Sequence, residues 1–451
     1  AGVGVGIARD PRFCACAKFW RDRHVGEPTG RPKTARSQVD TDILRIVKLR
    51  ATNIEKLGQK AFDVLIVGGG INGAVTAAAL AARGASVALI DRGDFAGFTS
   101  QASSNLVWGG FKYLENYEFR LVRKLSVSRN RLLDAYPANI TEIRFLAALD
   151  ESSPHPPWLG AMGSAAYWAI GSFQTKSPIY LSAEKIEERE PIIDTSHVRG
   201  GIEYSDSYLK DNDCRFVFGF VRAALDVGAV AVNYVSLESA VRSDGRWDVQ
   251  LEDQETGETI SCSAGLIVNA TGPFIDSVND MLDVVTEHRI VYSKGIHLVV
   301  PQLTPHERVL AFYDDTQRLF YVIPMGNRSV IGTTDNRVDT PYTEVTDVDR
   351  RFLLDQINDR LDLEEPLTDE DIIAERTGVR PLVVKRTGSD HEEVDWTALS
   401  RKHEIEIDKD RGVVSVFGGK LTDCLNVGEE VAEAIEQLGV SLEKDRGDWY
   451  G

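Results

Sequence analysis

Three glycines near the start of the folded part of the chain have the spacing of a dinucleotide-binding turn. Gly68, Gly70 and Gly73 follow a short β-branched run, and an alanine-rich stretch comes directly after them. In such a strand–turn–helix the first glycine permits the tight turn, the second lets a pyrophosphate approach, and the third allows close helix packing. Asp91, which ends the next apolar run, would accept a hydrogen bond from a ribose hydroxyl. The pattern predicts a βαβ unit over residues 62–91 that binds a dinucleotide.

Two later turns favour FAD over NAD. Residues 269–273 follow a buried apolar run, as expected where a chain returns to the cofactor from a second direction. Residues 418–422 end another such run and precede a helical stretch, whose N-terminus would stabilise the negative charge that develops on a flavin ring accepting hydride. A nicotinamide dehydrogenase has no evident use for this third turn at the cofactor, residues 418–422, so FAD is the predicted cofactor. The predicted contacts from these turns are Thr271, Gly272, Gly418, Gly419, Leu421 and Thr422.

A series of further motifs follows the glycine turn in a fixed order. They comprise residues 68–73, 99–106, 109–122, 204–206, 294–297, 331–335, 378–382, 400–401 and 416–422. In this order they resemble the FAD-dependent glycerol-3-phosphate dehydrogenase family, and the resemblance covers roughly Phe62 to Gly439. It implies a glutathione-reductase-type dinucleotide fold combined with an amine-oxidase-like substrate domain.

The resemblance also implies roles for residues at matching positions. Along the flavin it places Ser100, Ser104, Asn105 and Leu106, with Gly109 and Gly110 letting the backbone approach the ring. Around the substrate phosphate it places Lys112, Tyr113, Arg380, Arg401 and Lys420. His297 would sit beside the reacting carbon, where a neutral imidazole accepts the C2 hydroxyl proton as hydride leaves for the flavin. Arg380 is predicted to act in catalysis with His297, and a structural salt bridge is its alternative role.

Three positions depart from the family pattern. Asn105, Trp108 and Lys112 stand where the family usually has lysine, histidine and arginine, and a lysine at 112 gives a point charge in place of a bidentate guanidinium. The main prediction is oxidation of sn-glycerol 3-phosphate to dihydroxyacetone phosphate, with electrons passed to a quinone. Two alternatives stay open: a flavin oxidase or dehydrogenase acting on another hydroxy acid or amino acid, and a catalytically weak flavin-binding module.

Two interleaved layers are expected to position these residues. Buried runs such as 265–269 and 413–417 predict parallel strands of an FAD-binding domain. Alternating runs such as 319–323 predict an antiparallel sheet in a substrate domain. The fold class is therefore α/β, a glutathione-reductase-type Rossmann-like FAD-binding domain with an interleaved antiparallel-sheet substrate domain. The predicted segments are 61–115, 195–275 and 372–440 for the first domain, and 116–194 and 276–371 for the second.

Composition restricts the classes of partner. The formal charge of the 451-residue chain is -18, which opposes general binding to nucleic acid. Five cysteines form no CxxC pair, so neither a disulfide framework nor a metal site is predicted. No apolar run reaches the ~20 residues of a membrane-spanning helix. The predicted location is cytoplasmic, or peripheral on the inner face of the membrane.

Three segments outside the motifs carry further expectations. Residues 1–60 are expected to form a disordered basic extension, with a transit peptide as the alternative. Residues 123–131 carry four cations on an amphipathic pattern, which predicts a solvated face or a contact with a membrane surface. Residues 211–213 are expected to cap a helix and to have no catalytic role. The chain ends about thirty residues after Thr422, which is the pattern expected of a shortened member or a fragment of the family.

Overall fold

The computed structural model describes residues 49–115, 117–386, 402–443 and 449–450. It divides the chain into a unit of residues 1–52 and a unit of residues 53–451. In the first unit the described residues 49–52 are helical, and the helix continues to residue 59. The expectation of disorder is therefore wrong for residues 49–59, since they form a helix in which Leu57 is fully buried and Asn53 Nδ2 donates to the carbonyl of Ala231 at 3.2 Å. The remainder of the predicted extension, residues 1–48, lies outside the described residues.

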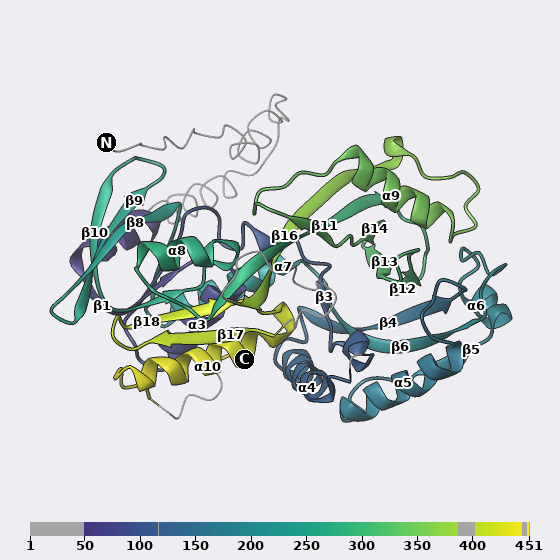
Figure 1. Ribbon diagram of the computed structural model, residues 1–451, viewed down its shortest axis with the longest axis horizontal. Helices are drawn as coiled ribbons and strands as arrows, with labels where there is room; N and C mark the ends of the chain where they lie inside the picture. The colour runs from purple at the N-terminus through teal and green to yellow at the C-terminus, as the bar shows by residue number, and fades with distance from the viewer. Residues whose placement is uncertain (1–48, 116, 387–401, 444–448, 451) are drawn as a thin grey trace, which may run out of the picture. The chain divides into compact units, whose positions relative to one another are not determined.

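Among the described residues, eight strands form the first sheet, sheet A (Figure 1). Its central strands run in the order β18-β10-β1-β2-β7 and are all parallel, while β17, β9 and β8 add antiparallel edges. Parallel strands of one sheet end at the same edge, so the turns that follow β1, β10 and β18 are brought together. The bounds are β1 Ala61–Val67, β2 Val87–Asp91, β7 Val230–Asn233, β8 Val235–Ser243, β9 Arg246–Asp253, β10 Thr259–Asn269, β17 Glu404–Asp408 and β18 Val413–Phe417.

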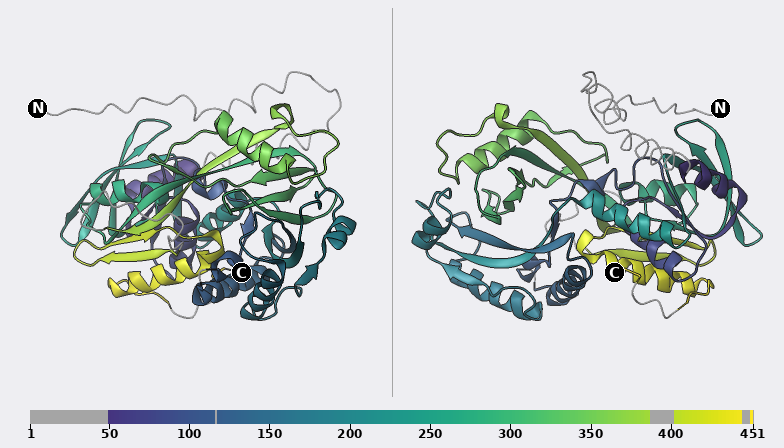
Figure 2. Two further views of the ribbon diagram at one scale, coloured as in Figure 1. Left: turned by 45° about the vertical axis from the view of Figure 1, so that its right-hand side comes forward. Right: turned by 180° about the vertical axis from the view of Figure 1, so that it is seen from behind.

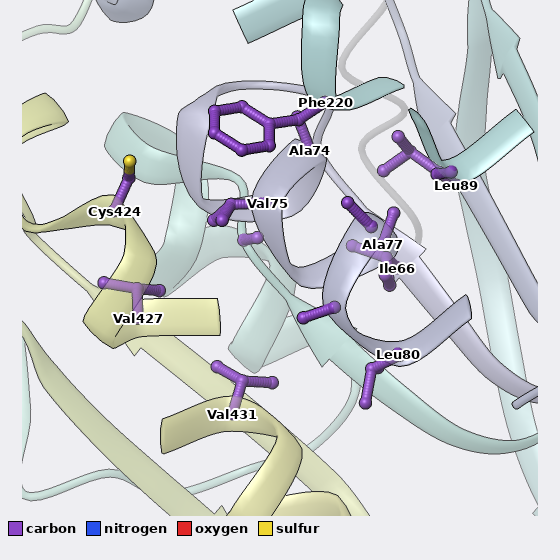
Figure 3. Close-up of a cluster of buried hydrophobic side chains, with 14 of the residues drawn as sticks. Ile66, Ala74, Val75, Ala77, Leu80, Leu89, Phe220, Cys424, Val427 and Val431 are labelled. Atoms are coloured by element: carbon purple, nitrogen blue, oxygen red, sulfur yellow. The ribbon is translucent and has the colours of Figure 1, made fainter. Parts of the chain in front are cut away.

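Helix α3 (Ile71–Ala82) is the buried helix of this layer. Its alanines let it pack closely against α7 (Asp213–Asp226) and α10 (Cys424–Gln437) in one hydrophobic cluster. In Figure 3, Phe220 of α7 lies beside Ala74, and α10 presents Val427 and Val431 on the side of Val75. This packing fixes the N-terminus of α3 at the edge where the parallel strands end.

The second sheet, sheet B, runs β15-β11-β14-β13-β12-β4-β6-β3, with β16 paired to β11 and β5 to β6. Its pairings are antiparallel, as the alternating runs predict, except that β4 and β12 are parallel. The bounds are β3 Leu106–Val107, β4 Ile140–Leu149, β5 Ile179–Leu181, β6 Gly200–Leu209, β11 His288–Pro301, β12 Arg308–Tyr313, β13 Leu319–Met325, β14 Arg328–Gly332, β15 Asn336–Val338 and β16 Ala374–Lys385.

Helices cover both faces of sheet B (Figure 2). Successive residues of β4 alternate between two cores, Phe145 and Ala147 in one and Leu146 and Ala148 in the other. The first core includes α4 and α5, and the second includes α6 and α9. The remaining helix bounds are α4 Phe119–Ala135, α5 Pro157–Ile170, α6 Ala183–Arg189, α8 Ile275–Met281 and α9 Asp347–Asn358. No helix among the described residues is both long and apolar enough to cross a membrane.

The chain crosses between the two sheets several times. Strands β3, β6 and β16 lie within the segments predicted for the FAD-binding domain, yet they pair in sheet B. β16 belongs to sheet B because it pairs along β11. This pairing sets Arg376 opposite His297 and Arg380 opposite Ser293. The α/β fold class with two interleaved sheets is confirmed, while the exact division into domains stays a prediction.

Candidate active site

The glycine turn after β1 has the geometry that its sequence predicts. Gly68 has φ +102°, and a Cβ there would lie 2.6 Å from the carbonyl oxygen of Ala270. A Cβ on Gly73 would lie 1.8 Å from the carbonyl oxygen of Gly68, so no larger residue fits. Gly70 caps α3 without a side chain, and the next amide, that of Ile71, donates to Ser100 Oγ at 3.0 Å. The turn therefore exposes backbone at a helix N-terminus, the usual cradle for a pyrophosphate.

Asp91 ends β2 and braces this turn. Its carboxylate accepts hydrogen bonds from the amides of Gly69 at 2.6 Å and Gly93 at 2.8 Å. Burial raises the pKa of Asp91, against the lowering effect of these two bonds. Each carboxylate oxygen accepts one of the two bonds and keeps a second lone pair, so the predicted bond from a ribose hydroxyl is compatible with the geometry.

The other two predicted turns meet the first. Thr271 Oγ1 donates to Asn269 Oδ1 at 2.6 Å. Gly272, with φ +56°, begins a short 3₁₀ turn, and a Cβ built on Gly272 would meet nothing within 4 Å. Asn72 Nδ2 donates to the carbonyl of Gly418 at 2.8 Å, and a Cβ on Gly419 would lie 3.0 Å from Asn72 Oδ1. Leu421 and Thr422 then form the 3₁₀ turn that leads into α10. Asn72 was not among the predicted site residues. Its polar side chain at the start of an otherwise small and apolar helix is the feature of the sequence that could have indicated it.

The predicted flavin loop, residues 100–110, is held against sheet B by Leu106 and by Thr99, which directly precedes it. Thr99 Oγ1 donates to the carbonyl of Val379 at 2.7 Å, and Leu106 lies in β3 opposite Tyr208. Asn105 is 4% exposed with φ +56°, and its Oδ1 has no hydrogen-bond partner among the described residues. An amide side chain tolerates this left-handed conformation better than most residues. The loop thus presents one buried, unsatisfied acceptor.

Gly109 and Gly110 are constrained by the protein itself. The amide of Gly109 donates to both carboxylate oxygens of Asp206 at 3.1 Å, and a Cβ at 109 would lie 2.2 Å from Tyr167 Oη. Gly110 has φ +88°, and a Cβ there would lie 2.6 Å from the ring of Tyr113. Contacts inside the protein therefore require both glycines, and their predicted approach to the flavin ring stays a prediction.

Asp206 is the centre of a buried network that the sequence did not reveal. Arg129 Nη1 lies 3.2 Å from its Oδ1, and Tyr167 Oη donates to its Oδ2 at 2.6 Å. Arg129 is only 1% exposed, so it is not part of a solvated cationic face on α4. Arg131 and Lys124 likewise pair with Glu429 and Glu430. The predicted solvated face is therefore present only in part: Arg123 and Lys124 are exposed, whereas Arg129 is buried.

The predicted phosphate ligands form two groups. Lys420 Nζ donates to Tyr113 Oη and lies 3.9 Å from the centre of that ring, and Lys112 precedes Tyr113 in the same 3₁₀ turn. Arg380 donates to Thr333 Oγ1 at 2.8 Å and to the carbonyl of Thr334 at 3.2 Å, and pairs with Asp335 at 3.4 Å. The ion pair agrees with the structural alternative for Arg380, while the guanidinium remains partly exposed. Arg401 lies outside the described residues.

His297 is buried in sheet B at 1% exposure. Its Nε2 lies 2.8 Å from Ser104 Oγ, and its Nδ1 has no hydrogen-bond partner among the described residues. Burial, followed by the positive charges of Arg376 and Arg380, lowers the pKa of His297 to about 3. The imidazole is therefore neutral at physiological pH, the form that accepts a proton.

Two further residues near His297 were missed. Arg376 donates to the carbonyl of Gln101 at 2.5 Å and lies 3.4 Å from Asp213 Oδ2, and the same carboxylate accepts from the amide of Ser103 at 2.8 Å. Asn212 alone caps α7, by accepting from the amide of Arg215. Asp213 instead accepts from Ser103 of the predicted flavin loop and from Arg376. The interpretation of residues 211–213 as a helix cap did not predict this contact.

These features fit FAD. The cradle at Gly68 and Gly73 excludes any side chain, and three turns at the ends of parallel strands meet around it. Buried polar atoms without a partner among the described residues, Asn72 Oδ1, Asn105 Oδ1 and His297 Nδ1, are available for a polar ligand. The fold and this donor set define an FAD-dependent oxidoreductase, and the family model described as FAD dependent oxidoreductase matches residues 63–434.

Similarity to known proteins shows which FAD-dependent oxidoreductases this chain is related to. The aerobic glycerol-3-phosphate dehydrogenase of Escherichia coli (strain K12) is 32% identical over 385 residues, covering 83% of this chain and 73% of that protein. The D-erythritol 1-phosphate dehydrogenase of Brucella abortus (strain 2308) is 31% identical over 397 residues, covering 86% and 75%. The crystal structure of the glycerol-3-phosphate dehydrogenase from Bacillus halodurans with FAD gives a TM-score of 0.67 at 27% identity, covering 86% and 67%. The chain belongs to the FAD-dependent glycerol-3-phosphate dehydrogenase family.

Proposed function

We propose that this enzyme oxidises sn-glycerol 3-phosphate at C2 to dihydroxyacetone phosphate. The observation that carries the proposal is a neutral, buried His297 flanked by the cations Arg376 and Arg380. A neutral imidazole suits removal of a hydroxyl proton, and cations suit a phosphate dianion. Glycerol 3-phosphate carries both groups, and two of the relatives above are named for it.

Each part of the site has a task in this reaction. When bound, FAD supplies the hydride acceptor. The turn at Gly68 and the N-terminus of α3 would bind its pyrophosphate through backbone amides. Lys420, steered by its bond to Tyr113, and Arg380 would orient the substrate through its phosphate. His297 would be the final acceptor of the proton that leaves the C2 hydroxyl as the carbonyl forms.

A longer polyol phosphate is a second candidate substrate. The relative from Brucella abortus is named for D-erythritol 1-phosphate, which offers the same phosphate and hydroxyl chemistry. Lys112 supports this candidate, since a lysine ammonium constrains the position of a phosphate less than a bidentate guanidinium does.

The test of the substrate is an anaerobic absorbance titration of the purified holoenzyme. We expect sn-glycerol 3-phosphate to bleach the oxidised flavin band, and a comparison with D-erythritol 1-phosphate ranks the two candidates. Bleaching by neither compound would overturn the proposed function, while the bound flavin would still report the cofactor. Glycerol without phosphate is the control and is expected to bleach the band far more slowly.

We further propose that a membrane quinone accepts the electrons and that the enzyme attaches peripherally to the inner face of the membrane. Support comes from α5, which has no charged residue and leaves Trp158 and Met162 each 62% exposed. Phe173, just beyond this helix, is 59% exposed. Exposed large apolar side chains that include tryptophan are typical of a membrane contact. Anaerobic reduction of a short-chain quinone by the substrate-reduced enzyme tests the acceptor, and peroxide formation in air without quinone reduction would indicate an oxidase.

A further inference from the structure

His297 is too enclosed to meet a substrate hydroxyl freely. Its strand, β11, lies between β14 and β16, with Gly332 and Arg376 directly opposite the histidine on the two sides. A Cβ on Gly332 would already lie 3.0 Å from His297 Cδ2, so the neighbouring strand is in close contact with the ring. The imidazole has 1% of its surface exposed, whereas Ser104 is only partly buried.

Ser104 is the polar group that contacts His297 from outside the strand. It belongs to the loop before β3, and its Oγ lies 2.8 Å from His297 Nε2. This is the only hydrogen-bond contact that the described residues give to the imidazole ring, since Nδ1 has none. A hydroxyl is both a donor and an acceptor, so it can receive one proton while releasing another.

We propose that Ser104 relays the C2 hydroxyl proton of the substrate to His297. The inference rests on the proposed function, because it concerns the same reaction. It reassigns Ser104 from a residue lying along the flavin to a catalytic residue that touches the substrate. His297 is then the base that accepts the proton from Ser104.

The relay balances atoms and electrons. The C2–H bond breaks with its electron pair, which leaves as hydride to the flavin. The O–H bond of the substrate hydroxyl breaks, its proton passes to Ser104 Oγ, and its electron pair forms the second C–O bond of the ketone. The original hydroxyl proton of Ser104 passes to His297 Nε2, which requires the imidazole tautomer with hydrogen on Nδ1.

Substrate charge would help His297 to accept that proton. Arg376 and Arg380 both lower the pKa of the imidazole, in addition to the effect of burial. A phosphate dianion close to Arg380 would offset part of this positive charge. Proton transfer to His297 would thus become easier once the substrate is in place, which couples phosphate binding to catalysis.

The experiment compares flavin reduction in variants of the holoenzyme under anaerobic rapid mixing with sn-glycerol 3-phosphate. Ser104→Ala is expected to retain FAD and to lower the limiting reduction rate by about 100-fold, within the usual range for general acid–base groups. Ser104→Thr keeps a hydroxyl and should recover most of the rate. Ser261→Ala is the control: it removes a serine hydroxyl that donates to Gln250 across the pairing of β10 with β9 at 3.1 Å, and it should keep the wild-type rate.

A double-variant cycle separates a relay from two independent roles. In a relay, Ser104→Ala combined with His297→Ala reduces the flavin no more slowly than the slower single variant, because both act in one step. Multiplicative losses in the double variant would overturn the relay. So would a wild-type rate in Ser104→Ala.

A readout without turnover checks the contact itself. In enzyme labelled with ¹⁵N in histidine rings, Ser104→Ala should shift one Nε2 resonance, the one that His297→Ala removes. An unchanged resonance would contradict the bond and the relay with it. If wild-type enzyme is not reduced by the substrate, the proposed function fails, and this spectrum still decides whether the Ser104–His297 pair exists.

Discussion

At the residue scale, the buried ion pair of Asp206 and Arg129 offers a sharp test of what holds the loop at Gly109. Removing one partner leaves the other charge buried and unpaired, so Asp206→Ala should lower the free energy of unfolding by about 3–5 kcal/mol. Urea denaturation followed by circular dichroism measures the loss. Arg199→Ala is the matched control, because Arg199 and Glu151 form an exposed pair, and such pairs contribute about 1 kcal/mol or less. If Asp206→Ala and Arg199→Ala lost the same free energy of unfolding, the buried pair of Asp206 and Arg129 would not stabilise the fold more than an exposed pair does.

Residues in short motifs could be predicted from the sequence, and their distant partners could not. Gly68 and Gly73 were identified because one turn requires both. Asn72 contacts Gly418, 346 positions away, and Arg129 contacts Asp206, 77 positions away. Such pairs depend on which strands become neighbours, which periodicity within a segment does not specify.

At the scale of elements, the α3 turn depends on close contact of helix and strand. A Cβ at position 73 would overlap the carbonyl of Gly68, so Gly73→Ala must displace either α3 or the turn. We expect purified Gly73→Ala to contain little FAD, measured as the ratio of flavin to protein absorbance. Gly219→Ala in α7 is the control, since nothing lies within 4 Å of that Cβ, and replacing a helical glycine should stabilise by about 0.5–1 kcal/mol. Full FAD content in Gly73→Ala would contradict the assigned role of the turn.

His403 ties the residues before β17 to the start of α10. Its Nδ1 lies 2.8 Å from Asp423, and its Nε2 lies 2.8 Å from Glu430, which also pairs with Lys124 of α4. Burial by itself lowers the pKa of His403, but the hydrogen bonds and charges of Asp423 and Glu430 outweigh it and raise the pKa to about 9. The protonated ring therefore joins three segments of the chain.

The raised pKa of His403 makes stability depend on pH in a definite direction. Its contribution is complete below the unfolded-state pKa of about 6.5 and is lost as pH rises through about 9, so the free energy of unfolding should fall by about 3 kcal/mol over that interval. Denaturation series from pH 6 to pH 10 measure this slope. His403→Gln should flatten it, and an identical slope in the variant would assign the effect to other groups.

The individual elements were more predictable than their pairing. The run of residues 62–91 forms β1, α3 and β2 as expected, because its pattern is local. The parallel pairing of β4 with β12 and the placement of β16 beside β11 are not local. An alternating strand shows which of its faces is buried and does not show its neighbour.

At the scale of the whole molecule, net charge decides how the protein could meet a membrane. A chain of formal charge -18 is repelled by anionic lipid, and three cations of α4, Lys124, Arg129 and Arg131, are already paired with acids. Attachment must then depend on apolar contact, for which α5 has the exposed side chains. Binding should therefore be as strong on neutral vesicles as on anionic ones and should persist at high salt.

Flotation with phosphatidylcholine vesicles tests this surface directly. Trp158→Ser combined with Met162→Ser removes two large side chains that are each 62% exposed. At about 1.5 kcal/mol for each side chain transferred from water, the double variant should bind vesicles about 100-fold more weakly. Val241→Ser in β8 is the control, because that side chain is similarly exposed, at 64%, but belongs to sheet A. Because these side chains are mostly exposed, flavin reduction by substrate in solution should be unchanged, whereas reduction of a quinone held in the vesicles should fall with binding. Undiminished binding by the α5 variant would place any membrane contact elsewhere on the chain.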